Sequence, residues 1–131
     1  MQWDFSMPAA GFSTARPWLP VPSGGPDVRT QSGDPGSLLS LYRDLLRLRR
    51  DHPGLRSADY ADIDAGADVY AFRRGDALLV AINFSDSPRQ AVMSAAANAT
   101  VVLSTGARSP GAMVDPRELV LEPNEAVILA G

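Results

Sequence analysis

Proline and glycine crowd the first 33 residues of this 131-residue chain, and this crowding limits most strongly what the segment can fold into. Five prolines lie between positions 8 and 26, and four glycines lie between positions 11 and 33. Because both residues interrupt regular structure, residues 1–33 are predicted to form an irregular arm without a long helix or a central strand. The arm also holds Trp3, Phe5, Phe12 and Trp18, so we expect it to pack on another surface.

An amphipathic helix is predicted over about 36–51. Asp34 can accept a hydrogen bond from a free backbone N–H, and Pro35 suits the first helical position. Arginines in the last turns and the Pro53-Gly54 pair predict the end of the helix. Apolar side chains recur every three to four residues, at Leu38, Leu39, Leu41, Tyr42, Leu45, Leu46 and Leu48. This stripe is wider than one small sheet would cover, which indicates a further neighbour.

Beyond residue 59 the pattern changes to that of strands. Residues 68–73 alternate in polarity and residues 77–82 form a continuous apolar run, with Gly75-Asp76 between them as a hairpin turn. Further strands are predicted at 90–94, 100–103, 118–121 and 126–129, separated by prolines and glycines. The predicted fold class is therefore mainly β with one long helix, and its strands form a small antiparallel β-sandwich or open sheet.

Charge and residue types exclude several classes of function. The chain has 12 basic and 15 acidic residues, so it offers no basic stripe for nucleic acid. It has no lysine, no cysteine and a single histidine, His52, which excludes Schiff-base chemistry, thiolate catalysis and a Cys/His zinc site. We predict no cofactor and no metal site.

Targeting signals are also missing from the sequence. No run approaches the roughly 20 apolar residues that a membrane span needs, and residues 1–12 do not resemble a secretory signal. We therefore expect a cytoplasmic protein with no membrane partner. Asn83 and Asn98 begin glycosylation patterns, but without a secretory signal we interpret both as turn residues.

Three local features permit a functional interpretation, and a simpler one is favoured for each. The Arg-Gly-Asp tripeptide at 74–76 matches an integrin-type motif, but a tight turn explains it. His52 could act as an acid or base, but a cation at a helix C-terminus is the commoner role. Aspartates at 59, 62, 64 and 68 could hold Ca²⁺, but their spacing does not follow an EF-hand, which favours a solvated connector.

Aromatic residues raise a second set of alternatives. Tyr42 and Tyr70 lie on apolar faces and are predicted to be core residues with a polar end. In the arm, residues 1–4, 10–13 and 17–21 combine aromatic rings with amide and carboxylate groups, a mixture suited to sugar rings. Aromatic residues that anchor the arm to a neighbour are the alternative.

Taken in order, several segments resemble one stretch of a known family. They are residues 1–4 (MQWD), 10–13 (AGFS), 17–21 (PWLPV), 34–35 (DP), 37–39 (SLL), 42–50 (YRDLLRLRR), 52–53 (HP), 69–73 (VYAFR) and 80–85 (VAINFS). Their order closely resembles the late part of α-glucosidases and oligo-1,6-glucosidases in the α-amylase family, glycoside hydrolase family 13. The resemblance is strongest over residues 1–85, and the segment from about 95 is similar only in being β-rich.

The resemblance implies a domain organisation. Residues 1–56 would be the end of a truncated (β/α)₈ barrel, with residues 1–33 as its loop after the eighth strand and the predicted helix as its last helix. Residues 57–131 would form the C-terminal antiparallel β-domain. Family members hydrolyse α-glucosidic bonds with retention, using two carboxylates on barrel strands. Those strands would precede this sequence, so no residue here is assigned a catalytic role and the chain alone is predicted to be inactive.

Gln2, Trp3 and Asp4 lie on a barrel-top loop in relatives, and they are the candidates to border the sugar site. The leading hypothesis is a non-catalytic fragment that stabilises the catalytic barrel, which would be its partner, with an α-glucoside or maltooligosaccharide as ligand of the full-length enzyme. One alternative is an α-glucan-binding module, although its aromatic candidates are expected to be too few and mostly buried: Tyr60, Tyr70, Phe72 and Phe84. The other is a dimerising interaction protein that pairs through residues 38, 41, 42, 45 and 48.

Overall fold

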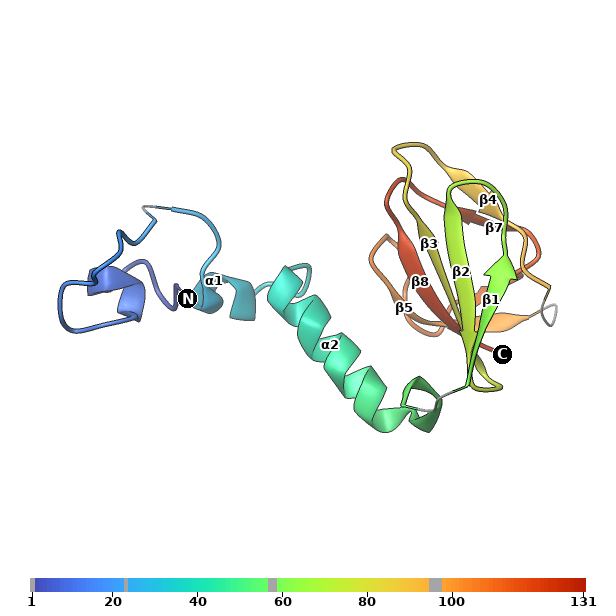
Figure 1. The fold of residues 1–131 in the computed structure, drawn as a ribbon, viewed down its shortest axis with the longest axis horizontal. Helices are drawn as coiled ribbons and strands as arrows, with labels where there is room; N and C mark the ends of the chain where they lie inside the picture. The colour runs from blue at the N-terminus through green and yellow to red at the C-terminus, as the bar shows by residue number, and fades with distance from the viewer. Residues whose placement is uncertain (1, 23, 57–58, 95–97) are drawn as a thin grey trace. The chain divides into compact units, whose positions relative to one another are not determined.

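A computed structural model describes residues 2–22, 24–56, 59–94 and 98–131 (Figure 1). The chain divides into two compact units, residues 1–48 and 49–131. Every strand found among the described residues belongs to the second unit. Within the described ranges, no helix is long and apolar enough to cross a membrane.

The first unit begins with the arm, which contains only short helices. These are the 3₁₀ turn η1 (Pro8–Gly11) and the five-residue helix α1 (Val28–Ser32). The carbonyl of Gln2 accepts a hydrogen bond from the backbone N–H of Val28 at 3.1 Å, and the carbonyl of Trp3 accepts one from that of Arg29 at 3.0 Å. The prediction that the arm has no long helix is confirmed, and backbone bonds fold it back on itself.

Asp27 organises the arm through its buried side chain. Its carboxylate accepts hydrogen bonds from the backbone N–H groups of Thr30 at 2.7 Å and Phe5 at 2.8 Å, and from the Thr30 hydroxyl at 2.6 Å. The Thr30 bonds close a capping box at the start of α1. Asp27 therefore joins two segments that lie 22 residues apart in the sequence.

The long helix α2 (Leu38–Asp51) confirms the predicted helix, but its cap differs from the prediction. Ser37 precedes the first helical residue, and its hydroxyl oxygen accepts a hydrogen bond from the backbone N–H of Ser40 at 3.2 Å. The predicted cap, Asp34, is wrong because its carboxylate instead accepts from the backbone N–H of Gly36 at 2.9 Å, in a turn before the helix. A 3₁₀ turn, η2 (Pro53–Leu55), follows α2.

Over the described residues, the second unit is a sandwich of two antiparallel sheets. The strands are β1 (Tyr60–Asp64), β2 (Val69–Arg74), β3 (Leu78–Asn83), β4 (Arg89–Ala91), β5 (Ala99–Ser104), β6 (Met113–Val114), β7 (Leu119–Leu121) and β8 (Ala126–Ala130). Six of them form a sheet in the order β1-β2-β3-β8-β5-β6, and β4 pairs with β7 in a second sheet (Figure 1). This architecture confirms the predicted fold class.

The core of this β-domain lies between the two sheets. Leu79 and Ala81 of β3, with Leu129 of β8, face Ala91 of β4 and Leu121 of β7 in one buried cluster. Because side chains alternate along a strand, the neighbouring residues of β1, β2 and β3 point to the opposite face of the large sheet. The centre of that second face also carries buried apolar residues, Leu78 and Val80 of β3 and Ile128 of β8.

Strand β1 corrects the interpretation of residues 59–68 as a solvated connector. The segment forms an edge strand that pairs antiparallel with β2, with Asp62 opposite Phe72 and Asp64 opposite Tyr70. Its charged side chains are exposed while Ala61 and Ile63 between them are half-buried. Acidic residues suit an edge strand because charge opposes edge-to-edge association.

Candidate functional site

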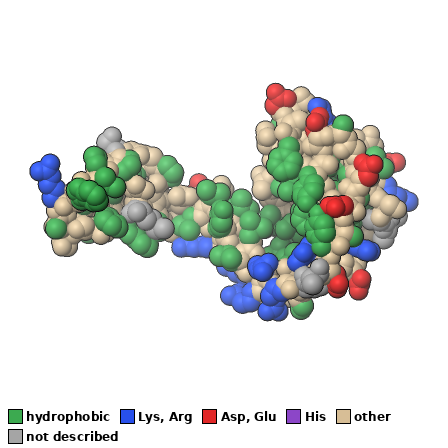
Figure 2. Space-filling view, viewed as in Figure 1, with side chains coloured by type: hydrophobic (Ala, Val, Ile, Leu, Met, Phe, Trp, Pro, Cys, Tyr) green, Lys and Arg blue, Asp and Glu red, His purple; other side chains and the backbone are tan. Residues whose placement is uncertain are grey.

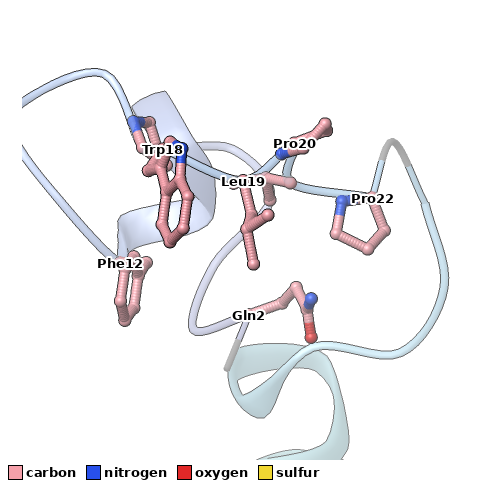
Figure 3. Close-up of a pocket in the computed structure, with 8 residues that line it drawn as sticks. Gln2, Phe12, Trp18, Leu19, Pro20 and Pro22 are labelled. Carbon is pink, nitrogen blue, oxygen red and sulfur yellow. The ribbon is translucent and has the colours of Figure 1, made fainter.

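The arm encloses a small pocket with mainly apolar walls. Its volume is about 320 Å³. The lining residues are Gln2, Phe12, Pro17, Trp18, Leu19, Pro20, Val21 and Pro22 (Figure 3). Gln2 supplies the one side chain in this set that can both donate and accept hydrogen bonds. The indole of Trp18 is 96% exposed, so the pocket is open at this side.

Figure 3 shows how the pocket joins separate parts of the arm. The rings of Phe12 and Trp18 lie near one another, and the Gln2 side chain lies opposite, beneath Leu19 and Pro22. Backbone bonds between residues 2–3 and the start of α1 hold Gln2 in place. The arm therefore has the combination of rings and one amide that the sequence pattern suggested.

Of the three predicted border residues of the sugar site, Gln2 alone lines this pocket. Trp3 and Asp4 are not among its lining residues. A Cβ atom added to Gly11 would lie only 3.3 Å from the Cβ of Trp3. Gly11 also has a φ of +68°, which favours glycine. This close approach explains why glycine is needed as the last residue of η1.

Asp4 is already occupied by bonds within the arm. Its carboxylate accepts hydrogen bonds from the hydroxyl of Ser6 at 2.6 Å and from the backbone N–H of Ser6 at 2.9 Å, and it pairs with Arg29 at 2.9 Å. These groups, with the Ser6 hydroxyl first, hold the pKa of Asp4 below its usual value. Asp4 is best explained as an anchor for the arm, and its role as a sugar-site residue stays a prediction.

A second hollow, of about 340 Å³, lies between the arm and the start of α2 within the first unit. Gln2 borders it as well, and the carboxamide oxygen of Gln31 accepts a hydrogen bond from the backbone N–H of Leu39 at 3.1 Å. Leu38, Leu39 and Tyr42 supply its apolar wall. This hollow continues directly into the apolar stripe of α2.

The stripe of α2 lies open. Leu38, Tyr42 and Leu46, which are spaced one turn apart, are 63%, 59% and 63% exposed. No residue of α2 is buried, and Figure 2 shows hydrophobic side chains along the helix beside basic ones. The prediction that Tyr42 is a core residue is therefore wrong, because this side chain is 59% exposed.

The other predicted functional features are explained by local structure. Gly75 has a φ of +56° in the β2–β3 turn, and its N–H donates to the carbonyl of Asp59 at 3.2 Å, so the tripeptide at 74–76 forms a turn as expected. The backbone carbonyl of His52 accepts from the N–H of Leu55 at 3.1 Å where η2 begins, and the role of its imidazole stays a prediction. Asp68 pairs with Arg89 at 2.9 Å. Within the described ranges, no group of three or more histidine or acidic side chains could hold a metal ion.

Sequence reasoning missed a cluster on the second face of the large sheet. The phenol oxygens of Tyr60 and Tyr70 lie 2.7 Å apart, and the Tyr60 hydroxyl donates to the carboxylate of Asp62. Both tyrosines are 45% exposed, which contradicts the prediction that they are mostly buried. Tyr70 points away from the core because its strand neighbours Val69 and Ala71 face the second sheet.

Comparisons with known proteins place the β-domain in a family. Residues 55–128 match a family described as "Domain of unknown function (DUF3459)". The chain is 30% identical over 113 residues to the glucan 1,6-alpha-glucosidase of Streptococcus pneumoniae, covering 82% of this chain and 21% of that protein. It is also 30% identical over 144 residues to the amino acid transporter heavy chain SLC3A2 of Oryctolagus cuniculus, covering 98% of this chain and 25% of that one.

A solved structure has the same fold over nearly the whole chain. It is a crystal structure of a mutant of the trehalulose synthase MutB in complex with glucose, with a TM-score of 0.81 and 32% sequence identity. The match covers 98% of this chain and 24% of MutB. The chain thus spans about a fifth to a quarter of the length of these relatives.

Proposed function

The chain belongs to the DUF3459 family, as the C-terminal domain of α-glucosidases and oligo-1,6-glucosidases in glycoside hydrolase family 13, and from this membership we propose that its role is structural rather than catalytic. In this proposal it stabilises a (β/α)₈ barrel that carries the catalytic carboxylates. The barrel is its partner, and an α-glucoside is the ligand of the assembled, cytoplasmic enzyme. The chain itself contributes packing surface and no reacting group.

One observation carries the proposal, and it is the open apolar row on α2. Leu38, Tyr42 and Leu46 share one face of the helix and leave most of their side-chain area in water. Burying a leucine side chain is worth about 1.5–3 kcal/mol, so a partner that covers this row would gain substantially. A row of this kind fits the surface that a last barrel helix presents to its neighbouring helices and strands.

Three acidic side chains are unsuited to act as a general acid. Asp4, Asp27 and Asp115 are held by hydrogen bonds to their own neighbours, which keep their pKa values low. A general acid needs a carboxyl group whose pKa is raised towards the working pH. A lowered pKa is the opposite of that requirement.

The names of the relatives give independent support. One is named as a glucosidase and another as the heavy chain of an amino acid transporter, although both match this chain at 30% identity. A segment that occurs in proteins with such different names is better explained by a shared structural task than by one shared reaction. This favours the packing role over a catalytic one.

A chimera tests the proposal. The matched segment of the Streptococcus pneumoniae enzyme would be replaced by this chain, and the melting temperature and glucosidase activity of the chimera would be measured. We expect Leu38→Asp, Tyr42→Asp and Leu46→Asp together to lower the melting temperature by several degrees with little change in KM, because they place charge in a buried contact. Val92→Asp, on an exposed valine of the β-domain, is the matched control. Equal melting temperatures for the triple variant and the control would contradict the proposal.

The chain alone gives a second test. We expect it not to hydrolyse p-nitrophenyl α-glucoside, because the family's catalytic carboxylates have no counterpart in it. The control is the same assay with the unaltered relative. Turnover that survives repeated purification of the chain would refute the non-catalytic role.

The apolar row also suits a second copy of the chain, and this observation favours homodimerisation as the second candidate. Sedimentation velocity of the chain alone separates the two. A dimer that the triple α2 variant dissociates would support pairing through α2. A monomer at all concentrations would leave the barrel as the partner.

A further inference from the structure

The second face of the large sheet carries a group of aromatic and acidic side chains at its β1–β2 edge. Tyr60 and Asp62 come from β1, and Tyr70 and Phe72 come from the adjacent strand β2. Asp62 lies opposite Phe72 in the strand pairing. We call these four residues the tyrosine patch.

The rings of the patch are in mutual contact. The centroid of Phe72 lies 5.4 Å from that of Tyr60 and 5.4 Å from that of Tyr70. The two tyrosine hydroxyls lie 2.7 Å apart, and the Tyr60 hydroxyl donates to Asp62. The bond to Asp62 comes first among the causes that raise the pKa of Tyr60, so its phenol stays protonated at neutral pH.

The patch lies on the face of the large sheet that is turned away from the second sheet, where Phe72 is opposite the buried Val80 of β3. The core cluster contains Ala71 of β2, whose side chain points away from those of Tyr70 and Phe72. Tyr60 and Tyr70 are each 45% exposed. Figure 2 shows hydrophobic and acidic side chains close together on the surface of the β-domain. The exposed parts of the Tyr60 and Tyr70 side chains are therefore available to a ligand.

The chemistry of the patch selects a class of ligand. Two carboxylates, Asp62 and the neighbouring Asp64, share this face with one guanidinium, that of Arg74 opposite Tyr60, so the charges do not favour an anion. The hydroxyls of the patch disfavour a wholly apolar partner, because burial would cost their bonds to water. A neutral ligand with an apolar face and a rim of hydroxyl groups satisfies both conditions.

A pyranose ring has this form. Its C–H face can lie on an aromatic ring while its hydroxyls exchange hydrogen bonds with Asp62 and the tyrosine oxygens. The bonds within the patch hold the rings before the ligand arrives, which reduces the entropy lost on binding. We propose that the tyrosine patch is a binding site for α-linked gluco-oligosaccharides on the β-domain. Only the choice of α-linked glucose rests on the proposed function, because it follows the ligand class of the related glucosidases.

Titration of the isotope-labelled full chain with maltohexaose tests the proposal by NMR. We expect saturable shifts of backbone signals in residues 60–64 and 69–74. Tyr60→Ala and Tyr70→Ala should each weaken binding by about three- to tenfold, the loss expected for removing one stacked ring. Tyr60→Phe keeps the ring and should cost less than Tyr60→Ala.

Matched controls make the outcome decisive. Phe84→Ala removes a 70% exposed ring of the same domain outside the patch and should leave binding unchanged. Cellohexaose, a β-linked chain of the same length, should bind more weakly than maltohexaose. Absence of shifts in the wild-type chain would overturn the proposal, as would shifts elsewhere or an equal loss in Phe84→Ala. Equal binding of cellohexaose would overturn the α-linked assignment.

The NMR titration can refute the sugar-binding proposal without affecting the proposal that the chain stabilises the barrel. It uses the chain alone and variants that leave α2 intact, whereas the test variant of the chimera experiment changes α2 and leaves the tyrosine patch intact. Loss of sugar binding with an intact effect of the α2 variants would remove the patch and leave the barrel-stabilising role. Sugar binding at the patch without an effect of the α2 variants would instead remove the barrel-stabilising role and leave the patch as a binding site.

Discussion

The arm and the β-domain are held together in different ways. In the arm, the buried groups include Ala10 and the polar residue Asp27, and most large apolar side chains are open to solvent. In the β-domain, buried Leu79, Leu121 and Leu129 join two sheets. The β-domain thus has a hydrophobic core of its own, while the arm depends on backbone and side-chain hydrogen bonds. We therefore expect the β-domain to fold without a partner and the arm to gain stability from one.

Removing a core side chain is the strongest way to test this difference. Leu121 is fully buried between the sheets, so Leu121→Ala should lower the free energy of unfolding by about 2–5 kcal/mol. Urea unfolding followed by far-ultraviolet circular dichroism would measure it. Val120→Ala, at the exposed neighbouring position, is the control and should cost far less. An equal loss for both would show that the sandwich core does not dominate the stability of the domain.

The core strands could be predicted from the sequence, and the edge could not. Strands β3 and β8 appear as short apolar runs because the centre of a sheet is covered. Strand β1 was missed because Asp62 and Asp64 point to solvent, and the sequence pattern of an exposed edge resembles that of a connector. The cap of α2 was placed on Asp34 because Ser37 and Asp34 are both suitable residue types, and only the backbone path distinguishes them.

The candidate sites depended still more on geometry. The pattern of rings and amides indicated the arm, but only the path of the loop places Gln2 with Phe12 and Trp18 and leaves out Asp4. The tyrosine patch depends on the register between β1 and β2, which sets Asp62 opposite Phe72. A register shift of one residue would send these side chains to the other face. Neither assembly could be obtained from residue spacing alone.

A buried amide offers the next test of the β-domain. The side-chain nitrogen of Asn83 donates to the carbonyls of Ser87 at 2.8 Å and Glu122 at 2.9 Å, and its oxygen accepts from the N–H of Ser85 at 2.9 Å. Asn83→Ala should lower the free energy of unfolding by about 2–3 kcal/mol, because buried carbonyls lose their partners. Asn98→Ala, at an exposed asparagine, is the control for urea unfolding.

These bonds also confirm that the pattern beginning at Asn83 is turn chemistry, since its side chain is 1% exposed and fully engaged. If Asn83→Ala and Asn98→Ala unfold at the same urea concentration, the network contributes nothing to the stability of the β-domain.

The arm should respond to acid where the β-domain core does not. Hydrogen bonds from Thr30, and then from Phe5, lower the pKa of Asp27 below its usual 3.8. A lowered pKa means that this contribution to stability is present above about pH 3.8 and is lost as the pH falls through the lower folded value. Both tryptophans lie in the arm, so their fluorescence reports it separately. We expect the tryptophan signal to change in acid before the circular dichroism signal of the sheets does.

Asp27→Asn provides the matched variant for this acid test. It retains the shape of the side chain but cannot titrate, so its tryptophan signal should depend less on pH in that range. Coincident fluorescence and circular dichroism transitions in the wild-type chain would instead show that the two units unfold as one.

The smallest expected effect concerns an exposed ion pair of the β-domain. The guanidinium of Arg117 binds the carboxylate of Asp115, with contacts of 2.6 Å and 2.9 Å, and lowers the pKa of Asp115 to about 2. Arg117→Ala should raise this pKa towards 3.8, as measured by NMR titration of the carboxyl carbon, while urea unfolding at pH 7 changes little because the pair is solvated. Arg56→Ala is the control. The Arg117–Asp115 pair would then change the pKa of Asp115 without contributing much to the free energy of unfolding. A large loss of stability in Arg117→Ala would instead mean that the β-domain, like the arm, depends on its polar contacts.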